Sequence, residues 1–323
     1  MRIASSDLLL TSVERALLPT LMIQRDAQGA IEPSSIACHY CESDSIQVVA
    51  AKKPWVGFEK ISGNYKQYYC NACGLFFIEP TPSQGDILNF FQEDYNRSRY
   101  SANTDLEKLL AWPKQDKTPY GILKIAIKRL LRHGPPEAVI LSHYFRRSAL
   151  NRIRLIDIGC AQGQLVRALR HLSIEAYGLE PHRETVEILR RDGCDYIWQG
   201  ELFSFPFETQ YDVVCLISTL THIRDIHRAF GILHRLLKDN GLVVTKEVNT
   251  DLASLDMSAP HAFTYFSTKF MRRVQQDFHF DGLDVWNYRA ASRSLELSES
   301  KIDSDCESRY FVFKKGRVGC ADR

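Results

Sequence analysis

LIDIGCAQGQLVRALR, residues Leu155 to Arg170, is the stretch that decides the fold. Apolar residues on both sides of Asp157 predict a buried strand, and the pattern from Gln164 onward is that of a helix. Between them, Gly159 and Gly163 predict a loop whose backbone can approach a ligand closely. A strand, a glycine loop and a helix in this order are typical of the ligand-binding edge of an open α/β sheet.

Strand and helix patterns alternate from residue 153 onward. The expected strands are 154–159, 175–180, 195–200, 211–218, 241–248, 280–288 and 308–316. The expected helices are 164–172, 182–193, 226–241 and 267–278. This alternation predicts an α/β fold, a Rossmann-like doubly wound sheet of seven strands. Since no long helix separates the last two strands, we expect them to form an antiparallel pair at one edge.

The chain divides by pattern into four segments. Residues 1–35 form an amphipathic segment, and residues 36–82 are rich in Cys, Tyr and Gly, which suits a small ribbon of hairpins. We expect a helical linker or lid over 83–152 and the Rossmann-like domain over 153–323. Apolar residues make up 45% and charged residues 25%, as in ordinary globular proteins.

Charge and hydropathy exclude some classes of protein. A formal net charge of +2 disfavours a dedicated nucleic-acid binder. No apolar run approaches the ~20 residues that span a bilayer. Glu14 and Arg15 interrupt the apolar N-terminus, so we expect no secretion and a cytoplasmic protein.

Four of the nine cysteines form two C-x-x-C pairs, Cys38/Cys41 and Cys70/Cys73. Both pairs resemble the zinc knuckles of a ribbon, although Glu42 follows the first pair where Gly74 follows the second. Four thiolates close a tetrahedral Zn²⁺ site and leave no position for a substrate, which indicates a structural metal. The alternatives are disulfides, which are rare inside cells, and cysteine pairs that arise by chance.

The glycine loop excludes two common nucleotide sites. A Walker loop needs G-K-[ST], which the chain lacks, and the G-x-G-x-x-G fingerprint fails because Ala161 and Gln164 stand at its second and third glycine positions. What remains is D-x-G-x-x-x-G, formed by Asp157, Gly159 and Gly163. This pattern resembles the first motif of class I S-adenosylmethionine-dependent methyltransferases, with Ala161 in place of the usual middle glycine.

The resemblance continues in register along residues 153 to about 315. In that family an acidic residue at the position of Glu180 holds the ribose hydroxyls, and the segment at Gly200 and Glu201 contacts adenine. Asp157 would orient the methionine ammonium group. The cofactor-binding residues that the resemblance implies are Asp157, Gly159, Cys160, Gly163, Glu180, Gly200, Glu201 and Ser218.

The acceptor side should follow the fourth and fifth strands. His222 and His261 are our two candidates for a catalytic base, since each stands where relatives line the active site. A helix-capping or structural histidine is the alternative for His222. Tyr265 is expected to wall the pocket, and Glu247, at the end of the fifth strand, should point toward the crevice.

The ribbon and its connecting segment resemble a bacterial branch linked to sugar, polysaccharide or natural-product modification. We therefore expect methyl transfer to an O, N or C atom of a small molecule. The basic stretch from Lys114 to Arg154 favours an alternative, an RNA methyltransferase whose zinc ribbon docks RNA. A catalytically silent cofactor-binding scaffold is a third hypothesis. The sequence leaves the acceptor and the oligomeric state open, including a homodimer.

Overall fold

The protein was studied as a computed structural model, which describes residues 36–52, 65–79, 81, 135–250, 262, 264–289, 294–297, 306 and 308–316. Several features expected from the sequence fall outside this part of the chain: the segment 1–35, the linker from 83 to 134, and His261. The division of the chain at residues 152 and 153 stays a prediction.

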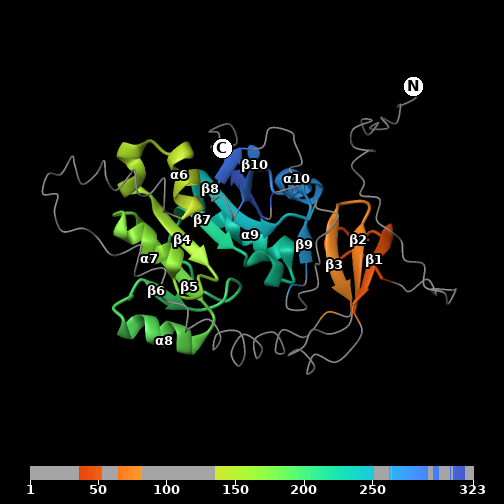
Figure 1. Cartoon of the computed structure of the whole chain (residues 1–323), viewed down its shortest axis with the longest axis horizontal. Helices are drawn as coiled ribbons and strands as arrows, with labels where there is room; N and C mark the ends of the chain where they lie inside the picture. The colour runs from red at the N-terminus through yellow and green to blue at the C-terminus, as the bar shows by residue number, and fades with distance from the viewer. Residues whose placement is uncertain are drawn as a thin grey trace, which may run out of the picture.

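An eight-stranded sheet forms the centre of the molecule, in the order β11-β10-β12-β8-β7-β4-β5-β6 (Figure 1). Its strands are β4 (Arg154–Ile158), β5 (Glu175–Glu180), β6 (Ile197–Gln199), β7 (Tyr211–Ile217), β8 (Leu237–Val248), β10 (Gly282–Arg289), β11 (Ser294–Leu297) and β12 (Ser308–Lys314). The five strands from β6 to β8 are mutually parallel, and β12, β10 and β11 continue the sheet antiparallel. The order reverses between β4 and β7, which is the switch point where ligands bind in such sheets.

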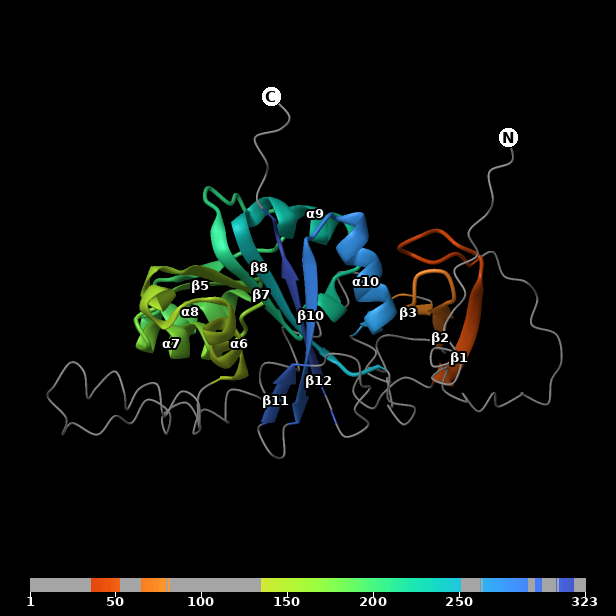
Figure 2. The ribbon, with the colours of Figure 1, turned by 90° about the horizontal axis from the view of Figure 1, so that it is seen from above.

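Helices cover both faces of this sheet (Figure 2). One face packs against α6 (Pro136–Tyr144), α7 (Gln164–His171) and α8 (Arg183–Arg191), and the other against α9 (Ile226–Leu236) and α10 (Thr268–Asp277). Two 3-10 helices, η3 (Arg147–Arg152) and η4 (Leu220–His222), precede β4 and follow β7. The side chains of His182, Asp225 and Ser267 cap α8, α9 and α10, so each helix begins where its first free N–H finds an acceptor.

The ribbon forms a second, four-stranded sheet in the order β1-β2-β3-β9. Strands β1 (Ile46–Lys52), β2 (Tyr65–Cys70) and β3 (Leu75–Glu79) come from the N-terminal segment, as the sequence predicts. The fourth strand, β9 (Thr264–Phe266), comes from nearly 200 residues further along and pairs antiparallel with β3. Figure 1 shows β9 between β3 and the larger sheet.

Two expectations about the larger sheet are wrong in detail. It has eight strands and not seven, because the short strand β11 pairs with β10 at the edge. The helix expected over 226–241 ends at Leu236, and residues from Leu237 onward already belong to β8. Leu237 pairs with Tyr211 of β7, so sheet pairing overrides the local helical pattern.

No helix in the described ranges is both long enough and apolar enough to cross a membrane.

Candidate functional site

The loop after β4 bends sharply back over the sheet. Gly159 and Gly163 have φ values of 71° and 68°, which glycine adopts without strain. A Cβ on Gly159 would lie 2.6 Å from Thr219 Cγ2, and a Cβ on Gly163 would lie 2.5 Å from Ile197 Cδ1. Backbone conformation therefore favours glycine at both positions, and at Gly159 the Thr219 side chain also leaves no room for a Cβ. Ala161 also has a positive φ, of 48°, which confines this part of the loop more than glycine would.

Glu180 closes β5 directly beside that loop. Its Oε2 accepts from the Ala161 N–H (2.8 Å) and its Oε1 from the His182 N–H (2.9 Å). Burial raises the pKa of Glu180, although these two hydrogen bonds oppose the shift. Each carboxylate oxygen can accept a further hydrogen bond. Glu180 can therefore be held in place by the backbone and still accept hydrogen bonds from two ligand hydroxyls.

Asp157 lies at the end of β4 and is only 3% exposed. Its Oδ1 is buried and has no hydrogen-bond partner among the described residues. Burial raises its pKa well above the ordinary value, and the negative charges of Glu137 and Glu180 add to the shift. A buried carboxylate oxygen without a partner is costly unless a ligand supplies a cation or a hydrogen-bond donor.

Glu137 was not predicted as part of this site. It lies in the first turn of α6, is 6% exposed, and accepts a hydrogen bond from the Tyr310 hydroxyl (2.7 Å). The negative charge of Glu137 acts on Asp157 because α6 packs against β4 and β12. No local sequence pattern reveals this packing. Three buried carboxylates, Asp157, Glu180 and Glu137, thus make this edge of the sheet suited to a positively charged group.

Other expected cofactor contacts are placed as follows. The Cys160 N–H donates to Leu179 O (3.1 Å), and its thiol fills the space beside Gly178. Gly200 donates to Glu180 O (3.1 Å), and a Cβ there would lie 2.7 Å from Phe205 Cδ2. Ser218 is exposed, has a φ of 55°, and donates its N–H to Lys246 O (2.9 Å). Glu201 is exposed. Their cofactor contacts remain predictions.

The residues expected on the acceptor side of the site lie in different parts of the chain, and only some of them are among the described residues. His222 ends η4, is half-buried, and lies at the same edge of the sheet as Asp157. His261 is outside the described residues, so its role also stays a prediction. Tyr265, in β9, packs with Phe76 and Ala262, and its place in a pocket wall stays a prediction.

Glu247, the penultimate residue of β8, is 2% exposed, and neither carboxylate oxygen has a hydrogen-bond partner among the described residues. Burial raises its pKa well above the ordinary value, opposed by the charge of Lys246.

The four knuckle cysteines converge. Their sulfur atoms all lie within 4.8 Å of one another, with Cys38–Cys73 and Cys41–Cys70 separations of 3.6 Å. Four thiolates bound to one Zn²⁺ at ~2.3 Å would lie about 3.8 Å apart, so the donor set fits a tetrahedral zinc site. All eight cysteines in the described segments are free thiols, which removes disulfides from the alternatives there. The hydrogen bond between Cys38 and Cys73 lowers the pKa of Cys38 and raises that of Cys73, so the two thiols share one proton when no metal is bound.

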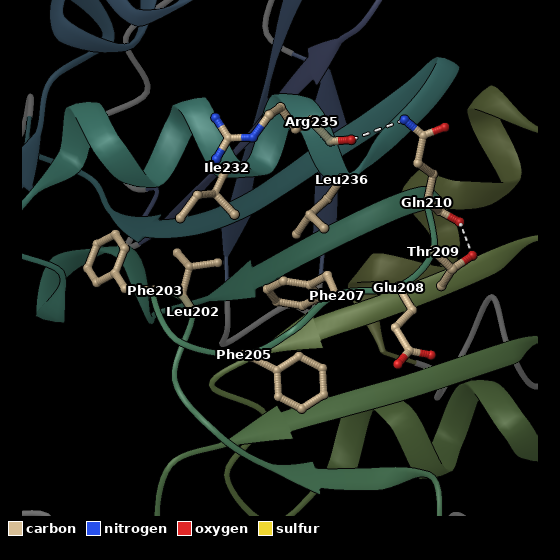
Figure 3. A pocket seen from close by; sticks show the side chains of 10 residues that line it. All are labelled: Leu202, Phe203, Phe205, Phe207, Glu208, Thr209, Gln210, Ile232, Arg235 and Leu236. Carbon is tan, nitrogen blue, oxygen red and sulfur yellow. Dashed lines mark hydrogen bonds between the residues drawn. The ribbon is translucent and has the colours of Figure 1, made fainter.

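A cavity of about 650 Å³ lies between α9 and the loop that follows β6 (Figure 3). Phe203, Phe205, Phe207, Ile232 and Leu236 provide its apolar lining. None of the expected cofactor or acceptor residues lines this cavity, so we do not assign the site to it.

Comparison with known proteins is consistent with this geometry. A family model described as a methyltransferase domain matches residues 96–287. A polyketide synthase, ThaQ, of Burkholderia thailandensis is 34% identical over 112 residues, which cover 31% of this chain and 5% of the synthase. The ubiquinone biosynthesis O-methyltransferase of Rhodopseudomonas palustris is 22% identical over 182 residues, or 51% of this chain and 72% of that enzyme.

Among solved structures, a SAM-dependent methyltransferase from Thermotoga maritima, titled a possible histamine N-methyltransferase, is 14% identical with a TM-score of 0.46, over 71% of this chain and 99% of that chain. Magnesium protoporphyrin IX methyltransferase from Synechocystis, with bound SAH, is 11% identical with a TM-score of 0.43, over 72% and 100%. Similarity at this level carries no argument about substrate.

Proposed function

Because this chain belongs to the methyltransferase domain family, we propose that it methylates an O, N or C atom of a small molecule, a sugar or natural-product precursor. It is an S-adenosylmethionine-dependent methyltransferase. The observation that carries the assignment of its cofactor site is the buried Asp157 carboxylate, whose Oδ1 has no hydrogen-bond partner among the described residues, beside Glu180 at the switch point of the sheet.

The residues present fit S-adenosylmethionine. When bound, this cofactor supplies an electrophilic methyl group on a sulfonium. Asp157 would bind the methionine ammonium group through Oδ1, which has no partner in the described part of the chain. The neighbouring groups Glu137 and Glu180 are themselves negative, so the ligand would supply the positive charge. Glu180, fixed by two backbone N–H groups, would accept the ribose hydroxyls. The N-terminus of α7 offers free N–H groups to the methionine carboxylate.

A small-molecule acceptor is favoured by charge and by the relatives. The net charge of +2 provides little general attraction for RNA. The two curated relatives are named for polyketide synthesis and for ubiquinone biosynthesis. Most of the basic stretch that favours RNA lies outside the described residues, so RNA is retained as an outcome of the test.

For the ribbon, we propose one structural Zn²⁺ held by Cys38, Cys41, Cys70 and Cys73. The support is the convergence of four sulfur atoms within 4.8 Å. Four protein ligands complete a tetrahedron, so the ion would shape the ribbon and leave the methyl transfer to the larger domain.

Calorimetry on the purified chain tests the cofactor assignment. We expect S-adenosylmethionine and S-adenosylhomocysteine to bind at one site per chain, and NADH and ATP not to bind. The acceptor is then sought with radiolabelled cofactor, comparing extracts of small molecules with total RNA at two salt concentrations. Label transferred to RNA would replace the small-molecule proposal, and cofactor binding with no labelled product from either source would support a silent scaffold.

A further inference from the structure

Buried side-chain oxygens without hydrogen-bond partners occur on β8 of the larger sheet and on β9 of the ribbon sheet. Within the described ranges, five buried side-chain oxygens lack a hydrogen bond, and one of them is the Asp157 oxygen assigned above. The other four belong to Thr245, Glu247 and Thr264. These residues are 0%, 2% and 1% exposed, so solvent at the surface does not satisfy them. Unsatisfied groups are rare in native interiors and call for a specific cause.

The geometry brings these atoms to the same layer. Thr245 and Glu247 are two residues apart on β8, so their side chains lie on the same face of the sheet. Thr250, which follows β8, donates from its hydroxyl to the Phe266 carbonyl of β9 (3.0 Å), and Val243 and Phe266 belong to the same core cluster. Thr264 is two residues from Phe266 and therefore lies on the same side of β9. The unpaired oxygens thus lie where the ribbon sheet meets the larger sheet, and ligand sites are common at such junctions.

A row of polar side chains extends from Glu247 across the sheet. Glu247 pairs in register with Arg309 of β12, and Arg309 pairs with Asn287 of β10. Arg309 donates from Nε to Asn287 Oδ1 (3.2 Å) and from Nη1 to Thr268 Oγ1 (2.9 Å). These two bonds direct the guanidinium toward Asn287 and α10. The carboxylate of Glu247, on the neighbouring strand, has no hydrogen-bond partner among the described residues. A structural ion pair would have joined these adjacent groups.

The row lies at the edge of the sheet that carries the cofactor loop. The Ser218 N–H donates to Lys246 O (2.9 Å), which joins the loop after β7 to the end of β8. Strand β7 separates β8 from β4, so the Ser218–His222 segment stands between Glu247 and Asp157 along this edge. Cys215 pairs with both Asp157 and Val244, which places Glu247 on the opposite face from Asp157. The unpaired oxygens of Glu247 and the unpaired Oδ1 of Asp157 therefore lie on different faces of the sheet.

We propose that Glu247, with Thr245 and Thr264, binds a hydroxyl group of a neutral, polyhydroxylated methyl acceptor. A hydroxyl donates to the carboxylate and accepts from a threonine hydroxyl, which matches the unpaired atoms in kind. An ammonium group fits less well because the positive charge of Lys246 already acts on Glu247. An anionic group would meet the carboxylate itself. This inference rests on the proposed methyltransferase function and specifies its acceptor.

Two variants test the role of Glu247, with Glu208→Gln as the control for loss of a carboxylate at an exposed position. Glu247→Gln keeps the shape, and Glu247→Leu removes all polar atoms. Calorimetry with S-adenosylhomocysteine comes first: we expect binding within twofold of the wild type in all variants. Loss of this binding in the wild type would refute the proposed function itself and is thereby distinguished from failure of the acceptor site.

Ligand-observed NMR on the S-adenosylhomocysteine complex then uses methyl α-glucoside as the neutral polyol and methyl 2-amino-2-deoxy-α-glucoside as the ammonium probe. We expect the neutral glycoside to bind the wild type and Glu208→Gln equally. Its affinity should fall about tenfold in Glu247→Gln, since hydrogen bonds to charged groups are the stronger ones, and binding should vanish in Glu247→Leu. Binding of the ammonium probe alone, no polyol binding by the wild type, or equal polyol binding by Glu247→Leu would overturn the proposal.

Thermal unfolding without ligand gives a readout that does not depend on the probe. An unpaired buried carboxylate is retained at a cost to stability. We therefore expect the Tm of Glu247→Gln to exceed that of the wild type by about 2–4 °C, the shift typical of a small stabilisation in a domain of this size. A lower Tm for Glu247→Gln would show that Glu247 stabilises the fold and would contradict a binding role.

Discussion

Ser267 and Gly74, 193 positions apart in the chain, are joined by a hydrogen bond of 2.6 Å from the serine hydroxyl to the glycine carbonyl. The same hydroxyl accepts from the Phe270 N–H (3.1 Å) and so caps α10. One side chain therefore holds the turn behind the second cysteine pair and starts a helix of the larger domain. Tyr40 strengthens this junction by donating to Asp277 Oδ2 (2.8 Å). The ribbon is thus built into the methyltransferase fold and is not a freely attached module.

Replacing Ser267 with alanine should lower the free energy of unfolding by about 1–2 kcal/mol, because a helix cap and a buried carbonyl both lose their partner. Chemical denaturation measures the change. Asp225→Ala is the matched control, since Asp225 caps α9 from an exposed position without touching the ribbon. If amide exchange in β2 and β3 is as slow in Ser267→Ala as in Asp225→Ala, the junction does not depend on this bond.

Elemental analysis of the wild type should find one zinc per chain, and Cys73→Ser should lose it. Loss of the metal frees β3 and thereby β9, so we expect acceptor binding to fail while S-adenosylhomocysteine still binds. Cys194→Ser is the control, because Cys194 is a free, buried cysteine away from the ribbon. Zinc-free wild-type protein with an ordered ribbon would contradict the assignment.

Gly159→Ala should weaken cofactor binding and destabilise the protein. The added Cβ meets Thr219 at 2.6 Å and the backbone has a φ of 71°. Gly193 separates the two effects, because its φ is 81° but nothing lies within 4 Å of an added Cβ. Gly193→Ala should cost only the ~1–2 kcal/mol of a left-handed L residue. Equal losses in the two variants would mean that the contact with Thr219 is unimportant.

Glu180→Gln should weaken S-adenosylmethionine binding by roughly 10- to 100-fold, because hydrogen bonds to a carboxylate are worth about 1.5–3 kcal/mol each. Calorimetry measures the dissociation constant. Glu187→Gln serves as the control, since Glu187 pairs with Arg183 on the surface of α8. Unchanged affinity in Glu180→Gln would remove Glu180 from the cofactor site.

The stability of the wild type should depend on pH through Glu247. Burial raises the pKa of Glu247 in the folded chain above its ordinary value of 4.5. Its protonated form therefore stabilises the fold fully below pH 4.5, and this contribution is lost as the pH rises through the folded pKa. Relative to Glu247→Gln, the wild type should lose up to about 1.4 kcal/mol per pH unit in that window. Denaturation curves from pH 4 to 8 that stay parallel would show that the carboxylate is not buried unpaired.

The sequence by itself determined the local elements and the chemistry of the cofactor edge. Neighbouring apolar residues mark the strands that end near Asp157 and Glu180, and Gly159 and Gly163 mark the loop between β4 and α7. Because β4 and β5 are parallel, these residues share one edge of the sheet. The sequence also identifies the two cysteine pairs, because the two cysteines of each C-x-x-C turn are close together in the chain.

Only the tertiary structure decided which distant segments pair. Nothing near Thr264 shows that β9 joins the ribbon sheet, and nothing near Leu237 shows that β7 will convert the end of a helical pattern into strand. Glu137 and Arg309 gain their places beside Asp157 and Glu247 through packing between segments far apart in the chain. Hydrophobic periodicity sets the type of an element, whereas pairing and burial depend on which surfaces remain to be covered once the whole chain has folded.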